Sequence, residues 1–254
     1  MGVATDDYGT LTIPEKFSYY NVCGIGPFVF SGDNAIHTLD CSHASHMQYI
    51  SAYTFENCTN LESVTLSPSF ITLGIGAFSG CTSLTDFDWA DSQVTSINNA
   101  TFSGCSSLQS MTLPESVTVI ENFAFTDCTS LNKLVIGEQV TSIGEESFSN
   151  DPNLTIYCYA DSYAHTYAAQ HNIPFKLMSH TQLGDVNMDG EINISDVTAI
   201  QRHLAQIETF SGESLLAADT SGDGAVDIND ATLLQRYLAK YTVTEPIGES
   251  IILP

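Results

Sequence analysis

Phenylalanine recurs at a nearly constant interval through the first part of the chain. Successive phenylalanines lie 23 or 24 residues apart from Phe55 to Phe148, and a weaker copy precedes them at Phe30. Apolar residues recur eight and five residues before each phenylalanine and six residues after it. This repetition is typical of a solenoid, whose short units bury their apolar edges only by stacking on one another. The repeated positions are Phe30, Phe55, Phe78, Phe102, Phe125 and Phe148, the pairs Val22/Ile25, Met47/Ile50, Phe70/Leu73, Val94/Ile97, Val117/Ile120 and Val140/Ile143, and the row Ile36, Leu61, Leu84, Leu108, Leu131 and Leu154.

A short alternating segment follows most of these phenylalanines. From Leu131 to Ile136 apolar and polar residues alternate, which predicts a half-buried strand. One such strand in each repeat predicts a parallel-strand solenoid. The equivalent segments are Leu61–Leu66, Leu84–Trp89 and Leu108–Leu113, in which Trp89 falls on a core row. The exposed strand positions Thr65, Asp88, Thr112 and Val135 offer no aromatic platform for sugar rings.

Over roughly residues 13 to 178 these repeats resemble the BspA-like leucine-rich repeats of bacterial surface and secreted proteins. The resemblance implies a leucine-rich repeat solenoid, of α/β or mainly β class, with a C-terminal helical cap. We expect that cap from Tyr163 to Asn172, with Ser162 at its start. Four tyrosines could form an aromatic platform there, although packing within the cap is favoured: Tyr157, Tyr159, Tyr163 and Tyr167. We assign residues 1–178 to the solenoid and 179–182 to a short linker.

The seven cysteines are expected to be free and mostly buried. Four occupy one row of the repeat, in which Asp33 and Asp151 replace the outermost members. Adjacent members would lie about 4.8 Å apart, near enough for a disulfide, but their Cβ vectors should point the same way. The row comprises Cys58, Cys81, Cys105 and Cys128, while Cys41 and Cys158 take an apolar strand position. No cysteine stands in the local pattern of a catalytic nucleophile, and His43 and His46 are interpreted as solvated turn residues rather than metal ligands.

The pattern changes after Met178. Twelve residues from Asp185 place oxygen-bearing side chains at loop positions 1, 3, 5, 9 and 12 and glycine at position 6, which fits a calcium-binding loop. The layout returns 34 residues later, from Asp219 to Asp230, so we expect two Ca²⁺ ions. The first ion is assigned to Asp185, Asn187, Asp189, the Glu191 carbonyl, Asp196 and, through water, Asn193. The second is assigned to Asp219, Ser221, Asp223, the Ala225 carbonyl, Asp230 and, through water, Asp227.

A helical pattern follows each loop, at Val197–Ala205 and Ala231–Ala239. Ile192 and Val226, at loop position 8, are expected to pair the loops back to back. Position 12 is Asp rather than Glu, and no amphipathic helix precedes the first loop, so neither loop belongs to a full EF-hand. Residues 183–241 instead resemble a type I dockerin, the module that binds cohesins in bacterial cellulosomes. This implies a small all-α domain over 183–242, followed by a tail over 243–254.

The resemblance also indicates which residues would contact the cohesin. Dockerins read their partner at loop positions 10 and 11 and near positions 17, 18 and 22. The Gln-Arg pair occurs in both halves, which permits a pseudo-two-fold exchange of the binding face. The residues are Ile194, Ser195, Gln201, Arg202 and Gln206 in the first half, and Ile228, Asn229, Gln235, Arg236 and Lys240 in the second. Isoleucine at position 10 departs from the hydroxyl pair of the best-known clostridial dockerins and suggests a different cohesin class.

Composition excludes some partners. Thirty acidic residues against six basic ones give a net charge of −24, which disfavours nucleic acid and anionic membranes. No apolar run of about 18 residues occurs, so no membrane insertion is expected. The first residues lack the pattern of a signal peptide, and we expect a leader to lie outside this sequence.

Together these features predict a non-catalytic cellulosomal protein. Its dockerin would bind a scaffoldin cohesin in a calcium-dependent manner, and its repeats would bind a protein or a polysaccharide during plant cell-wall breakdown. The protein would be secreted, extracellular and attached to a cell-surface cellulosome. The alternative is the C-terminal part of a cellulosomal enzyme or enzyme regulator, related to glycoside hydrolases or peptidases, whose catalytic module lies upstream.

Overall fold

The computed structural model of the protein describes residues 9–252. The chain divides into two compact units, Met1–Phe175 and Lys176–Pro254. Residues 1–8, at the start of the predicted solenoid, and residues 253–254, at the end of the predicted tail, lie outside the described residues.

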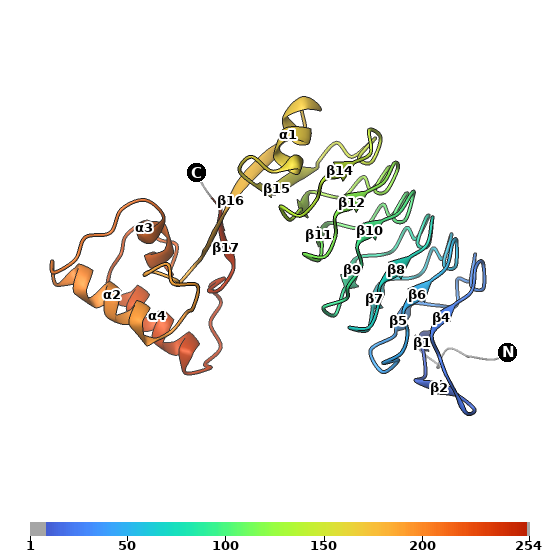
Figure 1. The fold of residues 1–254 in the computed structure, drawn as a ribbon, viewed down its shortest axis with the longest axis horizontal. Helices are drawn as coiled ribbons and strands as arrows, with labels where there is room; N and C mark the ends of the chain where they lie inside the picture. The colour runs from blue at the N-terminus through green and yellow to red at the C-terminus, as the bar shows by residue number, and fades with distance from the viewer. Residues whose placement is uncertain (1–8, 253–254) are drawn as a thin grey trace. The chain divides into compact units, whose positions relative to one another are not determined.

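The first unit is a solenoid built from short parallel strands (Figure 1). Each repeat contributes one strand to each of two series, and within each series the strands of neighbouring repeats pair in parallel, except at one repeat. An antiparallel hairpin near the N-terminus joins β2 (Lys16–Phe17) to β3 (Tyr20–Asn21). The first series contains β1 (Thr10–Thr12), β5 (Thr38–Asp40), β7 (Ser63–Thr65), β9 (Asp86–Asp88), β11 (Ser110–Thr112), β13 (Lys133–Val135) and β15 (Thr155–Tyr159). The second contains β4 (Gly24–Ile25), β6 (Tyr49–Ile50), β8 (Thr72–Leu73), β10 (Ser96–Ile97), β12 (Val119–Ile120) and β14 (Ser142–Ile143).

The repeated phenylalanines form the centre of the core. From Phe55 to Phe125 their side chains are fully buried, and successive rings stack with centroids 5.3 to 5.9 Å apart. Phe30 stacks on Phe55 at one end and Phe148 on Phe125 at the other. Each ring therefore buries its faces against the neighbouring repeats, which an isolated repeat could not do.

Both series of strands break at the same repeat. β9 does not pair with β11, and β8 does not pair with β10, within the described part of the chain. This repeat is the one with 24 residues between Phe78 and Phe102, and it carries two large aromatic residues, Phe87 in β9 and Trp89 directly after it. Phe87 packs edge-on against both phenylalanines, at 5.3 and 5.0 Å, and their own centroids are 5.9 Å apart. The loss of pairing thus coincides with an extra residue and an inserted aromatic ring.

Main-chain hydrogen bonds join the turns of successive repeats around each phenylalanine. Phe55 donates its N–H to the Ala77 carbonyl (2.9 Å), and the residues two before and two after it, Tyr53 and Asn57, donate to Ile75 (2.8 Å) and Ser79 (2.7 Å). Tyr53 and Asn57 both have positive φ, 56° and 57°. The same two positions are left-handed in other repeats, and this conformation turns their N–H groups toward the next repeat.

The C-terminal cap forms as expected, at α1 (Tyr163–Gln170), with the Ser162 side chain accepting from the His165 N–H. Tyr167 is buried and donates its hydroxyl to the carbonyl groups of Gly144 (2.9 Å) and Glu145 (3.1 Å). Tyr163 is 44% exposed, so the two tyrosines do not form a single platform.

The row thiols are free and point along the solenoid. Each donates to the carbonyl oxygen of the phenylalanine one repeat earlier: Cys58 to Phe30 (3.0 Å), Cys81 to Phe55 (3.1 Å), Cys105 to Phe78 (3.3 Å) and Cys128 to Phe102 (3.1 Å). Cys41 and Cys158 are also free and buried, whereas Cys23 is exposed. Because the side chains of this row all point toward the preceding repeat, adjacent thiols do not face each other as a disulfide requires.

The second unit packs three helices on one core: α2 (Ile194–Leu204), α3 (Glu213–Ala218) and α4 (Ile228–Leu238). Two strands accompany them, β16 (Phe175–Gln182) and β17 (Ser250–Ile252), which pair antiparallel. Residues 179–182, predicted to be a linker, are therefore the end of a strand. The tail also differs from the expectation, because Ile247 is buried in the helical core and Gly248 donates its N–H to the Leu183 carbonyl (2.8 Å).

Candidate metal loops and interaction surfaces

The first candidate calcium loop is wrapped around two aspartates. Asp185 accepts the N–H groups of Asp189 (3.1 Å) and Gly190 (3.0 Å). Asp196 is fully buried at the first turn of α2, where Oδ1 accepts from Val186 (2.9 Å) and Oδ2 accepts from Asn193 (2.9 Å). The last bond is half of a capping box that starts the helix. The loop and the helix after it are thus held by the same carboxylate.

The second loop repeats this arrangement. Asp219 accepts the N–H groups of Asp223 (3.2 Å) and Gly224 (2.9 Å). Asp230 is fully buried and accepts from Ser221 (2.9 Å) and Asp227 (2.8 Å), again as part of a capping box, on α4. Gly190 and Gly224 have φ of 85° and 90°, the conformation that requires glycine at position 6.

The donor set of each loop suits Ca²⁺. Asp196 and Asp230 are carboxylates buried without an ion pair to Lys or Arg among the described residues, so each loop lacks a cation to balance its charge. The remaining predicted donors are amide, hydroxyl, carboxylate and main-chain carbonyl oxygens, which a hard cation prefers. In the described residues no three His, Cys, Asp or Glu side chains alone are placed to hold a metal. The predicted sites therefore depend on Asn187, Ser221 and the carbonyl donors as well.

The predicted cohesin contacts all lie on the surface of the second unit. All ten residues are exposed, including Ile194 at 65% and Ile228 at 61%. These two isoleucines begin α2 and α4, which pack on each other through the shared core. Ile192 and Val226 are partly buried against that core. The duplicated positions are thus presented twice on one small domain.

Two features of the second unit were missed by the sequence analysis. α3 is six residues long, and its N-cap, Gly212, makes no side-chain hydrogen bond, so the sequence carries little helical signal there. Glu213 at its first turn accepts hydroxyl hydrogen bonds from Ser179 and from Thr181 (2.8 Å) of β16. These bonds lower the pKa of Glu213. They tie α3 to the strand that enters the domain.

The first unit exposes aromatic side chains that the strand positions did not reveal. Phe28 is 58% exposed and stacks on Tyr53, with ring centroids 5.2 Å apart. Both residues stand two positions before the repeated phenylalanine and have left-handed backbones, with φ of 59° and 56°. A bulky residue in this conformation costs about 1–2 kcal/mol. In the later repeats the same position holds Gly76, Ala100, Phe123 and Glu146. Comparing this position between repeats, rather than the strand positions, could have located the Phe28/Tyr53 pair from the sequence.

The hairpin carries further exposed aromatic residues: Phe17 at 51%, Tyr19 at 94% and Tyr20 at 79%. His43 and His46 lie on the surface in the next repeat, near Asp40 (4.0 Å) and Glu15 (3.8 Å) respectively. Within residues 9–252 they form part of no metal cluster, and their interpretation as turn residues stays a prediction.

Comparison with known families gives two matches. Residues 23–155 match the BspA type leucine rich repeat region in six copies, and residues 183–239 match the dockerin type I domain. The first match covers more than half of the chain. No helix in the described part of the chain is long and apolar enough to cross a membrane.

Solved structures were found with the same kind of repeat. A leucine rich cell surface protein from Faecalibacterium prausnitzii is 27% identical, with a TM-score of 0.48, and 63% of this chain aligns with 50% of that one. A leucine rich repeat protein from T. pallidum is 23% identical, with a TM-score of 0.45, over 59% of this chain and 58% of that one. This chain thus spans less than two thirds of either protein.

Proposed function

Because the chain belongs to the family of BspA type leucine rich repeat proteins and also carries a type I dockerin domain, we propose that it is a non-catalytic adaptor of a cellulosome. A type I dockerin binds a cohesin and calcium, and a leucine-rich repeat region is an interaction module. The duplicated loop and helix, with equivalent positions exposed twice, is the observation that carries the proposal. The dockerin attaches the protein to a scaffoldin, and the repeats bring a second partner to that scaffold.

The proposed dockerin holds two Ca²⁺ ions, one in each loop. The ligands are those assigned from the sequence, from Asp185 to Asp196 and from Asp219 to Asp230. Bound calcium would neutralise the carboxylates gathered in each loop and fix the loop onto the helix after it. Asp196 and Asp230 link the two parts, because each also caps its helix. Calcium thereby orients the exposed residues at the start of α2 and α4.

The proposed cohesin contacts are the ten exposed residues of the two halves. Ile194 and Ile228 expose large apolar side chains beside the loops, and an apolar contact surrounded by polar residues is a usual arrangement for a protein interface. Gln201, Arg202, Gln235 and Arg236 supply hydrogen-bond donors farther along the same helices. This assignment supports a calcium-dependent interface with a scaffoldin.

For the repeat region we propose a polysaccharide or protein ligand, bound during the breakdown of plant cell walls outside the cell. The proposed location is a cellulosome attached to the cell surface. The Phe28/Tyr53 pair, in which Phe28 is exposed and Tyr53 half-buried, is the best candidate contact, since aromatic rings bind sugar rings and apolar side chains well and these two rings are stacked.

Titration calorimetry of the full chain against a panel of type I cohesins tests the dockerin role. We expect binding in calcium that EDTA abolishes and that added calcium restores. The double variant Asp196→Asn/Asp230→Asn should bind calcium more weakly and lose cohesin affinity. Binding that persists in EDTA, or a wild-type chain that binds no cohesin of the panel, would contradict the proposal.

Depletion of the full chain by insoluble plant-wall polysaccharides tests the repeat role. Specific depletion, reduced by Phe28→Ala/Tyr53→Ala, would identify the repeats as a polysaccharide-binding module. Thr65→Ala/Thr112→Ala, on the strand face, is the matched control and should deplete like the wild type. No depletion would favour a protein ligand for the repeats.

A further inference from the structure

The two halves of the dockerin share a helical sequence but differ at the C-terminal end of the helix and just beyond it. Gln201-Arg202 and Gln235-Arg236 lie at equivalent positions, 34 residues apart. After these pairs, several equivalent residues differ in size or charge. The differing pairs are His203/Tyr237, Gln206/Lys240, Ile207/Tyr241, Glu208/Thr242 and Phe210/Thr244.

Near the C-terminal end of α2, the side chains of Arg202 and His203 contact other residues of the same domain. The Arg202 guanidinium pairs with Glu208, with 3.2 Å between Nε and Oε2. The His203 ring is covered by Phe210, whose ring is parallel to within 4° at a centroid distance of 4.4 Å. The Phe210 N–H also donates to His203 Nδ1 (3.1 Å). The arginine and the ring of this half are therefore both engaged within the domain.

The end of α4 is open. Thr242 replaces Glu208, and Arg236 forms no ion pair with any residue in the described part of the chain. The Glu245 carboxylate, whose pKa Arg236 helps to lower, accepts hydrogen bonds from Thr244 instead, with 2.9 Å to the main-chain N–H and 3.1 Å to Oγ1. Tyr241 is as exposed as its equivalent Ile207, at 67% against 69%, and presents an aromatic ring and a hydroxyl there.

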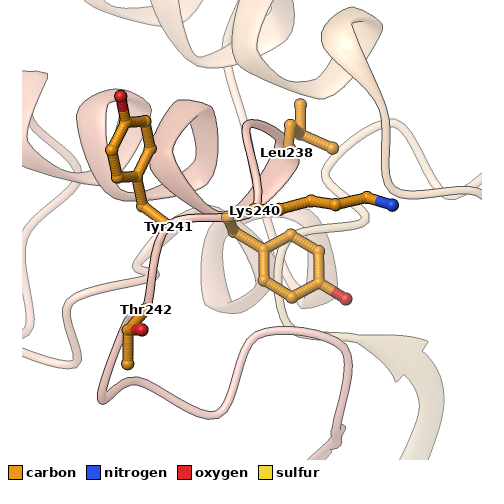
Figure 2. Close-up of a pocket in the computed structure, with 5 residues that line it drawn as sticks. Leu238, Lys240, Tyr241 and Thr242 are labelled. Atoms are coloured by element: carbon orange, nitrogen blue, oxygen red, sulfur yellow. The ribbon is translucent and has the colours of Figure 1, made fainter.

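A surface pocket of about 450 Å³ lies at this end of α4. It is lined by Tyr237, Leu238, Lys240, Tyr241 and Thr242. Figure 2 shows the Lys240 and Tyr241 side chains diverging from the end of the helix, with Thr242 farther along the chain. Lys240 is also one of the predicted cohesin contacts, so the pocket adjoins the proposed interface.

Charge favours one kind of partner for this end. Arg236 and Lys240 are two of only six basic residues in a chain of net charge −24. At the equivalent end of α2, Glu208 offsets Arg202 and Gln206 is neutral. A partner surface rich in carboxylates is thus attracted to α4 and gains little at α2.

We propose that the two faces of the dockerin are unequal, and that the α4 end, with Arg236, Lys240 and the adjoining pocket, is the primary face for a cohesin surface that presents carboxylates around an apolar side chain. The proposal rests on the proposed cohesin binding. Glu208 is the residue that weakens the α2 face, because Arg202 must leave it to reach a partner. Releasing an exposed ion pair costs up to about fivefold in affinity.

Single-face variants of the full chain, titrated with the cohesin that the wild type binds, test the inequality. We expect Arg236→Ala to weaken binding about tenfold and Arg202→Ala to weaken it much less. Lys133→Ala removes one positive charge from the repeat region and is the control for net charge. Circular dichroism in calcium confirms that each variant is folded.

Exchanging the two residues that distinguish the faces tests the role of Glu208. Thr242→Glu installs the acid of the first half beside Arg236 and should weaken binding and flatten its dependence on salt. Glu208→Thr, made in the Arg236→Ala background, should restore part of the lost affinity through the α2 face. A wild type that binds in calcium while Arg202→Ala and Arg236→Ala bind equally overturns the proposed inequality. A wild type that binds no cohesin contradicts the proposed function itself, and the inequality with it.

Discussion

At the scale of single residues, the cysteine row of the solenoid combines a small buried side chain with a hydrogen bond to the preceding repeat. Four thiols donate along the stack to phenylalanine carbonyl groups, and burial raises the pKa of all four, to about 11 for Cys58. A buried, protonated thiol is inert, since the thiolate is the nucleophile. These cysteines therefore act as packing residues with a weak donor.

Thiol reactivity should separate the seven cysteines. We expect one of them, the exposed Cys23, to react with a thiol reagent in the native protein at pH 8, and the six buried ones to react only after unfolding. Counting modified thiols by mass spectrometry checks this, with Cys23→Ser as the control that should abolish native labelling. Rapid modification of Cys105 would contradict the buried row.

The last member of the row, Asp151, is expected to make the solenoid less stable as pH rises. Among residues 9–252 neither carboxylate oxygen has a hydrogen-bond partner, and burial, aided by the charge of Asp127, raises the pKa of Asp151 to about 7. The folded state thus holds the proton more tightly than the unfolded chain, whose aspartate has a pKa of about 3.9. The stability from this group is complete below about pH 4 and is lost as pH rises through about 7.

Asp151→Cys, which places the row's own thiol at this position, tests the expectation. The melting temperature of the variant minus that of the wild type should increase from pH 5 to pH 8. Asp33→Cys, at the other end of the row, is the matched control, because its carboxylate accepts the Ala35 N–H (3.0 Å). An Asp151→Cys difference that is constant with pH would show that Asp151 does not titrate in this range.

At the scale of elements, regular features could be predicted from the sequence and irregular ones could not. The spacing of Phe55, Phe78 and Phe102 predicted the stacked core, because a short repeat has only one way to bury such residues. α3 and the β16–β17 pair were missed, since six residues without a capping side chain and a short distant pairing leave little local pattern. The candidate loops were assigned because calcium chemistry dictates the spacing of oxygen donors, and their role as calcium sites stays a prediction.

The pairing of β16 with β17 makes the C-terminal segment part of the dockerin. Ile247 is 7% exposed and packs in the helical core, so Ile247→Asp buries an unpaired charge and should destabilise the second unit by about 2–4 kcal/mol. Urea unfolding in calcium measures the loss. Ile207→Asp makes the same change at a residue that is 69% exposed and should cost less than about 0.5 kcal/mol. Equal effects of the two substitutions would mean that the tail does not belong to the core.

At the scale of the whole molecule, each unit has its own hydrophobic core, and only the second carries candidate calcium loops. Calorimetry in calcium should therefore show two unfolding transitions, of which EDTA lowers one. A ligand at 1,000 times its dissociation constant stabilises the folded state by about 4 kcal/mol. Asp196→Asn/Asp230→Asn should reproduce the effect of EDTA on the same transition. A shift of both transitions by EDTA would indicate that calcium also stabilises the repeats.

The turn-to-turn hydrogen bonds of the solenoid also determine how it would respond to force. Under the proposed function, a protein held both by its dockerin and by the ligand of its repeats would be under tension when the scaffold moves. Bonds between repeats lie along the stacking direction, so the layers bear that load in series, with the fewest strand contacts between the Phe78 and Phe102 repeats. The repeats would yield one at a time, and a single-molecule extension trace would show steps that each release 23 to 25 residues.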